Sequence, residues 1–241
     1  EKIIEMAKDE QVCPYEISMA IATKAKVIIT DYYYLFNPSI GENFLQKINR
    51  EPKDLIVVVD EAHNLPFRLK DLASEYLSSV TLRRAIKEAK KFGYLEKVEI
   101  ISRIQDLILE LGQELKIEEE KFVLKQDIKD ELEKEYGYED LIADFEFIGD
   151  SIRETQRQSY IGAIATFLEK WQGPDKAFAR ILSYKRGSRK PYYLLSYRCL
   201  DPSVVCAPLI NNTHSSILMS GTLVPIDMYK ELLGVEKSQE V

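Results

Sequence analysis

The sequence predicts an α/β protein in which a small parallel sheet is interrupted by a long, mainly helical insertion. Short, continuous apolar runs occur near both ends of the 241 residues, whereas the middle of the chain has helical periodicity. Continuous apolar runs are typical of strands buried on both faces of a parallel sheet. Because neither end has enough strands to bury a core alone, we expect both ends to form one sheet domain, with the middle inserted into it.

The elements at the two ends are predicted from apolar runs and from the residues that stop them. Near the N-terminus we expect a helix over 17–26 and strands over 26–32 and 55–59. Near the C-terminus we expect a strand over 192–200, a strand over 216–219 and a helix over 226–233, stopped respectively by Asp201-Pro202, Ser220-Gly221-Thr222 and Gly234.

The middle of the chain, from about 69 to 170, is predicted to be helical. The clearest stripe recurs at positions i, i+4, i+7, i+8 and i+11, formed by Ile100, Ile104, Leu107, Ile108 and Leu111. Apolar residues near 72–77, 148–152 and 161–168 indicate further helices. We find no internal repeat and no low-complexity tract.

Composition indicates a folded intracellular protein. The chain is 45% hydrophobic, and it shows no membrane-spanning run and no signal-peptide pattern. A net charge of −7 argues against a uniformly basic nucleic-acid binder but not against a local basic groove. Acidic residues concentrate over 110–146, which favours a solvated face over a protein-docking surface. Frequent Lys, Glu, Ile and Tyr favour a thermophilic source.

The chemically most informative segment is Asp60-Glu61-Ala62-His63, directly after the apolar run over 55–59. Carboxylates at the carboxyl end of a parallel strand lie where open α/β sheets bind ligands. One can hold Mg²⁺ on a nucleotide and the next can orient an attacking water. Two alternatives are an ordinary helix N-cap at Asp60 and a metal site of Asp60, Glu61 and His63. The second lacks the H-E-x-x-H spacing that would complete it.

Four segments together resemble the XPD family of superfamily 2 iron–sulfur DNA helicases, and a DinG-like relative would share the same layout. They are Cys13-Pro-Tyr-Glu16 with the following 26–35 segment, Val59-Asp-Glu-Ala-His-Asn64, Leu200-Asp-Pro202 and Met219-Ser-Gly-Thr-Leu223. Their order and spacing are far more specific than any one segment.

The resemblance implies a partial RecA-like parallel sheet, motor domain 1, with a large arch insertion. Residues 1–16 would end an iron–sulfur domain, 17–68 would form the first part of the motor domain with motif II, 69–190 the arch, and 191–241 the second part with motif III. The family implies an ATP-dependent 5′-to-3′ DNA helicase acting in DNA repair. We expect an archaeal source and a cytoplasmic location, or a nuclear one if the source is eukaryotic.

The resemblance also implies roles for single residues. Asp60 and Glu61 would form motif II, with Asp60 on the Mg²⁺ of ATP. His63 would couple the nucleotide to motif III, Ser220-Gly221-Thr222, although these three residues alone predict an ordinary turn. Cys13 would be one of four ligands of a 4Fe-4S cluster, although a lone cysteine is more often a core residue. We expect Cys199 and Cys206 to be packing residues.

Two family features do not occur in these residues. There is no G-x-x-x-x-G-K-[ST] phosphate loop, and there are no three further cluster cysteines. We therefore expect an internal fragment that neither hydrolyses ATP nor holds a cluster alone. The alternative is a non-catalytic arch module that binds single-stranded DNA or a partner protein, and a phosphate loop encoded upstream of Glu1 would distinguish the two.

Candidate contacts to single-stranded DNA combine basic and aromatic side chains. One predicted helix carries Arg83, Arg84, Lys87, Lys90 and Lys91. The segment that leads into the strand at 192 carries Lys185, Arg186, Arg189, Lys190, Tyr192 and Tyr193. The end of the strand predicted from 26 carries Tyr32, Tyr33 and Tyr34. A solvated helix face and a polar loop remain the alternatives. We further expect a repair protein to dock on the arch, and no membrane contact.

Overall fold

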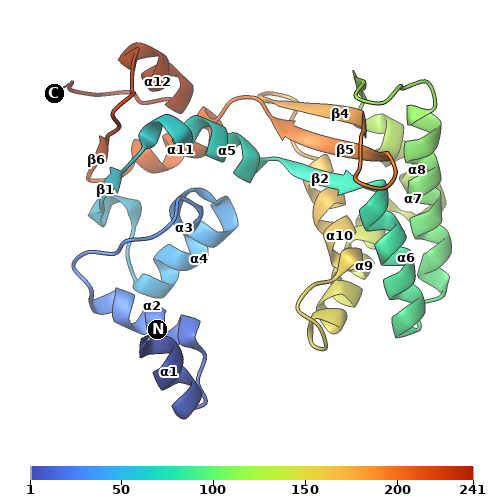
Figure 1. Cartoon of the computed structure of the whole chain (residues 1–241), viewed down its shortest axis with the longest axis horizontal. Coiled ribbons are helices and arrows are strands. Elements are labelled where there is room, and N and C mark those ends of the chain that lie inside the picture. The colour runs from blue at the N-terminus through green and yellow to red at the C-terminus, as the bar shows by residue number, and fades with distance from the viewer. Residues whose placement is uncertain (1, 241) are drawn as a thin grey trace. The chain divides into compact units, whose positions relative to one another are not determined.

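The computed structural model describes residues 2–240, with only the backbone of Lys2 and Ser39, and divides into two compact units. Unit 1 comprises Glu1–Ala73 and Asp201–Val241, and unit 2 comprises Ser74–Leu200 (Figure 1). Unit 2 is thus an insertion into unit 1. None of the helices described is both long enough and apolar enough to span a membrane.

Unit 1 is built around a two-stranded parallel sheet. β1 (Ile56–Val59) pairs with β6 (Ser215–Leu218) in a register that places Val59 opposite Leu218. Its helices are α1 (Lys2–Asp9), α2 (Pro14–Lys24), α3 (Tyr33–Phe36), α4 (Pro38–Ile48), α5 (Leu65–Ala73), α11 (Ser203–Ile210) and α12 (Ile226–Leu233), with 3₁₀ turns at Pro52–Asp54 and Ala62–Asn64. The core packs β1 against α3, α5, α11 and α12.

The apolar run over 55–59 predicted a strand buried on both faces, but β1 is buried on only one face. Val57 and Val59 are 5% and 3% exposed, but Ile56 and Val58 are 65% and 57% exposed. The reason is that helices of unit 1 cover only the face that carries Val57 and Val59. The other face of the two-stranded sheet meets solvent.

The strand predicted over 26–32 does not form either. The segment is irregular, and Val27 and Ile29 are 77% and 95% exposed. A β-branched run becomes a strand only when a neighbouring strand accepts its hydrogen bonds. Among the described residues, no strand pairs with this segment.

Unit 2 combines an antiparallel sheet with helices. The strand order is β2-β5-β4-β3, formed by β2 (Glu75–Ser78), β5 (Tyr192–Cys199), β4 (Phe178–Lys185) and β3 (Glu120–Phe122). The helices are α6 (Ser79–Phe92), α7 (Glu96–Gly112), α8 (Gln126–Tyr136), α9 (Tyr138–Arg153) and α10 (Tyr160–Trp171). In Figure 1 the strands of unit 2 lie along one side of its helices, and α6, α7 and α10 contact the sheet.

These boundaries differ from the 69–190 expected for the insertion. β5 pairs with β4 along its whole length and with β2 over Leu194–Tyr197, so it belongs to the sheet of unit 2 and not to the flanking parallel sheet. The preceding α5 packs on the core of unit 1, which moves the start of the insertion to Ser74. The insertion is therefore a mixed α/β unit with more sheet than its periodicity predicted.

The helical stripe at 100–111 faces the core of unit 2. Ile104 and Ile108 are 1% and 0% exposed, as the spacing predicts. Helices α9 and α10 cross closely at Gly149 and Gly162, where a Cβ added to Gly149 would lie 2.6 Å from the Gly162 Cα. Only glycine permits this approach, which brings two backbones of the core together.

A buried carboxylate joins α6 to α10. The Glu88 side chain accepts hydrogen bonds from the Ile161 amide at 2.8 Å, the Ser159 hydroxyl at 2.9 Å and the Gln156 amide at 2.7 Å. These donors belong to the first turn of α10 and the residues before it, where amides lack helical partners. Because Glu88 points inward, the neighbouring basic residues of α6 are left on its outer face.

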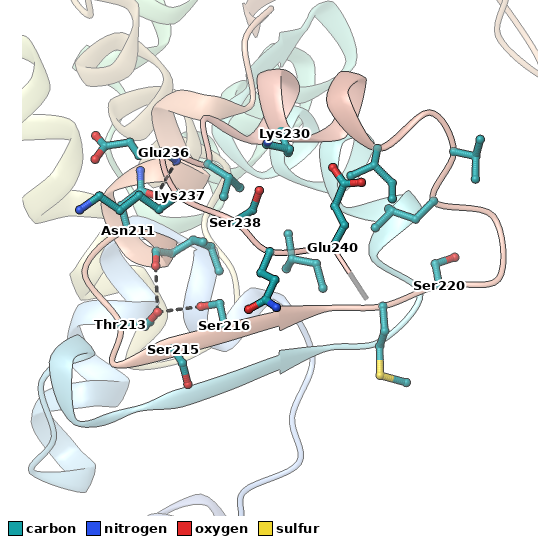
Figure 2. Close-up of a pocket in the computed structure, with 18 of the residues that line it drawn as sticks. Asn211, Thr213, Ser215, Ser216, Ser220, Lys230, Glu236, Lys237, Ser238 and Glu240 are labelled. Atoms are coloured by element: carbon teal, nitrogen blue, oxygen red, sulfur yellow. Dashed lines mark hydrogen bonds between the residues drawn. The ribbon is translucent and has the colours of Figure 1, made fainter.

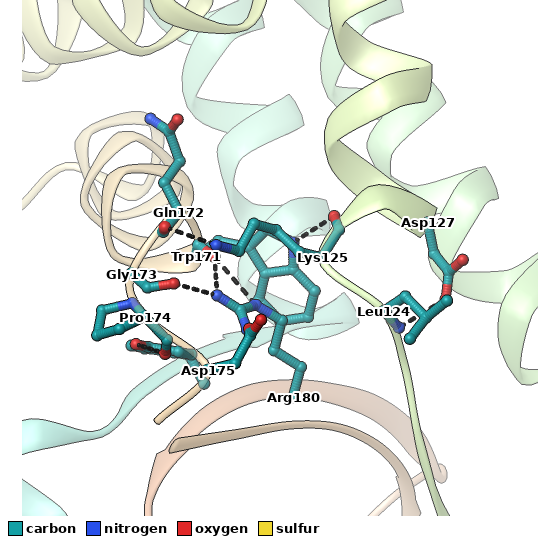
Figure 3. Close-up of polar contacts among 10 residues, drawn as sticks. Leu124, Lys125, Asp127, Trp171, Gln172, Gly173, Pro174, Asp175 and Arg180 are labelled. Atoms are coloured by element: carbon teal, nitrogen blue, oxygen red, sulfur yellow. Dashed lines mark hydrogen bonds and ion pairs between the residues drawn. The ribbon is translucent and has the colours of Figure 1, made fainter. Parts of the chain in front are cut away.

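Arg180 of β4 is a buried cation in unit 2, with a side chain 3% exposed (Figure 3). Its guanidinium donates to the carbonyl oxygens of Trp171, at 2.6 and 3.0 Å, and Gly173, at 2.7 Å, and pairs with Asp175. It also lies between the rings of Trp171 and Tyr197, 5.2 and 4.7 Å from their centroids. Arg180 therefore fixes the end of α10 against the sheet.

Replacing Arg180 with Met is expected to destabilise the protein by about 2–4 kcal/mol, because buried carbonyls lose their donors. The free energy of unfolding would be measured by urea titration followed by circular dichroism. Asp175→Asn is the matched control, since Asp175 is 81% exposed and should change stability little. Equal unfolding midpoints for Arg180→Met and the wild type would contradict this role.

Unit 2 should fold when produced alone as residues 74–200. It has its own buried cluster, and its two ends are joined by the hydrogen bond from the Cys199 amide to the Ser74 hydroxyl at 2.9 Å. We expect one cooperative thermal transition by circular dichroism together with dispersed amide signals in an NMR spectrum. A broad, non-cooperative melt with collapsed signals would show that unit 2 depends on unit 1.

Candidate functional site

The candidate site in unit 1 lies where the two parallel strands end. β1 ends at Val59, so Asp60 and Glu61 emerge at its carboxyl edge, and the parallel register brings Ser220 beside them from β6. The Met219 amide donates to the Val59 carbonyl at 3.0 Å, which extends the pairing past the strand ends. The Asp60 carboxylate accepts the Glu61 amide at 2.9 Å. Both carboxylates are exposed at this edge.

A chain of polar contacts joins the two strand ends. His63 Nδ1 lies 2.7 Å from Ser220 Oγ and 3.2 Å from Glu61 Oε2. Ser220 Oγ is also 3.5 Å from Glu61 Oε2 and accepts the Thr222 amide at 3.2 Å. A carboxylate, an imidazole and a hydroxyl are therefore within one hydrogen-bonded cluster, although 159 residues separate Glu61 from Ser220.

This cluster can respond to a ligand at the carboxylates. If Glu61 turned towards a bound molecule, His63 and Ser220 would lose its carboxylate as an acceptor and would form hydrogen bonds with other groups. Hydrogen-bond exchange of this kind is how a local charge change moves a neighbouring segment. Gly221 has no neighbour within 4 Å of an added Cβ, so the segment after Ser220 lies in open space.

A cavity of 710 Å³ adjoins this edge but does not contain the carboxylates (Figure 2). It lies between β6, α12 and the segment over 235–240, and Ser220 and Gly221 line one end of it. Its charged lining is mixed, with Lys230 and Lys237 beside Glu236 and Glu240. The cavity therefore lacks the uniform positive character of a phosphate site, and the strand-end cluster defines the candidate site better.

The cysteines differ sharply in their surroundings. Cys13 is exposed at the start of α2, whereas Cys199 and Cys206 are buried, as expected of packing residues. Burial raises the pKa of the Cys206 thiol to about 12, so this group stays protonated and is a poor metal ligand. In residues 2–240, no group of three or more His, Cys, Asp and Glu side chains is placed to hold a metal. Cys13 could supply one ligand to a cluster, and the described residues do not fit a whole one.

The basic residues predicted on α6 lie on its exposed face. Arg83, Arg84 and Lys87 are exposed, as are Lys90 and Lys91. The Arg84 guanidinium lies over the ring of Tyr160, 5.4 Å from its centroid. Cations next to an aromatic ring form a surface that suits nucleic acid, although a solvated face has the same appearance.

The second predicted group lies on the β4–β5 hairpin of unit 2. Lys185 ends β4 and is 3.6 Å from Glu120, while Arg186 and Arg189 are in the exposed connection. Tyr192 begins β5 and is half-buried. Tyr193 stacks on Tyr184 with centroids 4.4 Å apart and packs against the core of unit 2. Tyr193 is thus the least available of these residues for stacking on a base.

Part of the acidic region between 110 and 146 is ion-paired. Arg103 of α7 contacts Glu110, Glu131 and Glu135 at 3.2, 3.6 and 3.1 Å. Sequence spacing gave no signal for this network, because its members come from α7 and α8. Likewise, nothing in the sequence indicated the contact of Tyr32, whose hydroxyl donates a hydrogen bond to the Asp60 carbonyl.

Comparison with known proteins finds similarity to one group of helicases. The DEAD_2 family model matches residues 1–82. The chain is 24% identical to the "General transcription and DNA repair factor IIH helicase subunit XPD/RAD3" of Saccharomyces cerevisiae, over 97% of this chain and 38% of that protein. It is 27% identical to the "ATP-dependent DNA helicase XPD" of Sulfolobus acidocaldarius, over 95% of this chain and 38% of that protein.

Solved structures of XPD proteins are also similar to this chain. A structure titled XPD helicase matches with a TM-score of 0.68 and 27% identity, over 98% of this chain and 39% of that one. A structure titled truncated XPD matches with a TM-score of 0.65 and 25% identity, over 100% of this chain and 65% of that one. The fold of this chain is therefore similar to the matching part of these XPD structures. The chain is similar in sequence and in fold to XPD/RAD3-type helicases, and it spans 38% of the length of the two curated relatives named above.

Proposed function

We propose that this chain is part of an ATP-dependent 5′-to-3′ DNA helicase acting in DNA repair, located in the cytoplasm or, in a eukaryote, the nucleus. The observation that supports this most is the cluster of Glu61, His63 and Ser220, which connects a carboxylate pair to a second strand end. The likeness to the Sulfolobus acidocaldarius protein, an ATP-dependent DNA helicase by its name, supports the same assignment.

In this proposal, the exposed Asp60 carboxylate would hold the Mg²⁺ of MgATP, since Mg²⁺ prefers carboxylate and phosphate oxygens. Glu61 would orient the water that attacks the γ-phosphorus, so that the bond to the β-phosphate oxygen breaks and ADP and phosphate leave. As Glu61 turns towards the water, His63 and Ser220 would exchange partners. That exchange would signal the state of the nucleotide to the Ser220-Gly221-Thr222 segment.

Unit 2 would be the arch, which helps to form the pore for single-stranded DNA. The DNA path would be lined by the exposed cations of α6 and by Lys185, Arg186, Arg189 and Tyr192 of the β4–β5 hairpin. Tyr193 would support these residues by packing against the core of unit 2. Cys13 would contribute one thiolate to a 4Fe-4S cluster completed by residues outside this chain. A repair protein would dock on the arch.

The alternative is a non-catalytic arch module that binds single-stranded DNA or a partner protein. It is favoured by the separate core of unit 2 and by the lack of a G-x-x-x-x-G-K-[ST] loop in the 241 residues. The two functions differ in what the complete gene encodes and in whether its product hydrolyses ATP.

The product of the complete gene should hydrolyse ATP with Mg²⁺ and be stimulated by single-stranded DNA, whereas the 241 residues alone should not. Glu61→Gln should lower turnover in the complete product about a hundredfold, the effect expected from losing a group that orients water. Released phosphate would be measured against Glu10→Gln, an exposed carboxylate of unit 1, as the control.

An inactive complete product, or one with no phosphate loop, would reject the helicase and leave the binding module. Turnover by the purified 241 residues that Glu61→Gln abolishes would show instead that the chain needs no further phosphate-binding segment.

The chain should also bind an oligo-dT strand in a salt-dependent manner, measured by fluorescence anisotropy. Removing three cations of α6 (Arg83, Arg84 and Lys87 to Ala) should weaken binding and reduce the slope of log K against log salt by about 0.7 for each lost phosphate contact. Removing Lys185, Arg186 and Arg189 should act similarly.

The matched control removes three exposed lysines from the acidic region, Lys116, Lys121 and Lys134. It makes the same change in net charge. If all three triple variants lost the same affinity, binding would follow net charge, and the proposed DNA path would be wrong.

A further inference from the structure

The turn that carries the two carboxylates has an unusual backbone. Glu61 has φ 49° and ψ 42°, the left-handed region that residues with a Cβ seldom adopt. Such a conformation persists only where the surroundings hold it. The contacts of the Asp60–Ala62 turn therefore decide where the Glu61 carboxylate points.

Two contacts hold this turn from opposite sides of the peptide chain. On the amide side, the Ala62 N–H donates to the Met219 carbonyl of the β6 strand end at 3.0 Å. On the carbonyl side, the Tyr32 hydroxyl donates to the Asp60 carbonyl at 2.5 Å and lies 3.3 Å from the Glu61 carbonyl. The hydroxyl thus lies within reach of the carbonyl oxygens of the two peptide groups that flank the left-handed residue Glu61.

Tyr32 is well suited to this contact. Its ring packs against the core of unit 1 just before α3, so its position is set by the core and not by the turn. Burial and the nearby Asp60 and Glu61 raise the pKa of the Tyr32 phenol, so the hydroxyl remains a proton donor. Tyr76 of β2 is 40% exposed and provides a comparison outside the candidate site.

We propose that Tyr32 is a positioning residue of the candidate site, whose hydroxyl holds the Asp60–Ala62 turn so that the Glu61 carboxylate meets His63 and Ser220. The inference rests on the proposed function and deepens it. When MgATP is bound, Tyr32 would act on hydrolysis only through Glu61, without touching the nucleotide. Loss of the hydroxyl should therefore affect turnover and not the binding of ATP.

The test is Tyr32→Phe, which keeps the ring in the core and removes the hydroxyl. In the product of the complete gene, kcat for DNA-stimulated ATP hydrolysis should fall on the order of tenfold, because small misplacements of a reacting group cost up to about a hundredfold. The KM for ATP should change less than about twofold, since uniform substrate binding is left intact. Tyr76→Phe, the same change at an exposed tyrosine of β2 that is outside the candidate site, should behave as the wild type.

A second measurement uses the 241 residues and needs no activity. Amide hydrogen exchange at Ala62, followed by NMR, should be faster in Tyr32→Phe than in the wild type or in Tyr76→Phe, because the turn loses the hydrogen bond from the Tyr32 hydroxyl. Exchange in the β1–β6 pair should not change. A general loosening of the fold would speed exchange at both places.

The outcomes are distinct. An active wild-type product whose kcat is unchanged by Tyr32→Phe overturns the inference, as does an Ala62 exchange rate that Tyr32→Phe leaves unaltered. If the complete wild-type product has no ATPase activity, the proposed function fails. The exchange rate of Ala62 then decides alone whether Tyr32 holds the turn.

Discussion

The parallel pairing of β1 with β6 is the interaction on which both the site and the chain's organisation depend. The two strands are more than 150 residues apart in sequence, yet their register places Val59 beside Leu218. Because parallel strands share a carboxyl edge, the pairing necessarily brings the Asp60–His63 segment to Ser220. It also closes unit 1 around the insertion, since everything from Ser74 to Leu200 lies between the paired strands. One set of backbone hydrogen bonds thus assembles the cluster and defines unit 2 as an inserted body.

Local sequence was sufficient for elements whose pattern matched their surroundings. The stripe with Ile104 and Ile108 predicted α7, and the stop at Gly234 marked the end of α12. Local sequence failed to predict structure where a strand forms only by pairing with a distant strand. Val27 and Ile29 have strand propensity but no partner strand among the described residues. β4 was missed because Arg180 interrupts the apolar pattern on the face that packs against the helices. That position is tolerable only with the carbonyls at the end of α10, and no local pattern contains that information.

The site shows the same division between local and distant information. Position after an apolar run was enough to single out Asp60 and Glu61 as candidates. The link from His63 to Ser220 followed only from resemblance to a family, because composition and spacing do not relate segments so far apart. The sequence predicts Tyr32 and its neighbours as candidate DNA contacts, and only the structure shows that the Tyr32 hydroxyl donates to the Asp60 carbonyl. Two neighbouring tyrosines can have unrelated roles when one faces the core and the next faces solvent.

The closure of the ends of unit 2 has a consequence for how such genes can change. The Ser74 hydroxyl and the Cys199 amide are hydrogen-bonded, so the two ends of the inserted unit lie close together in space. A recombination event could remove the encoding segment, or replace it with another domain whose termini meet, without disturbing the strands on either side. Unit 1 and unit 2 can therefore be inherited separately. Under the proposed function, selection on nucleotide chemistry would act on unit 1, and selection on DNA or partner recognition on unit 2.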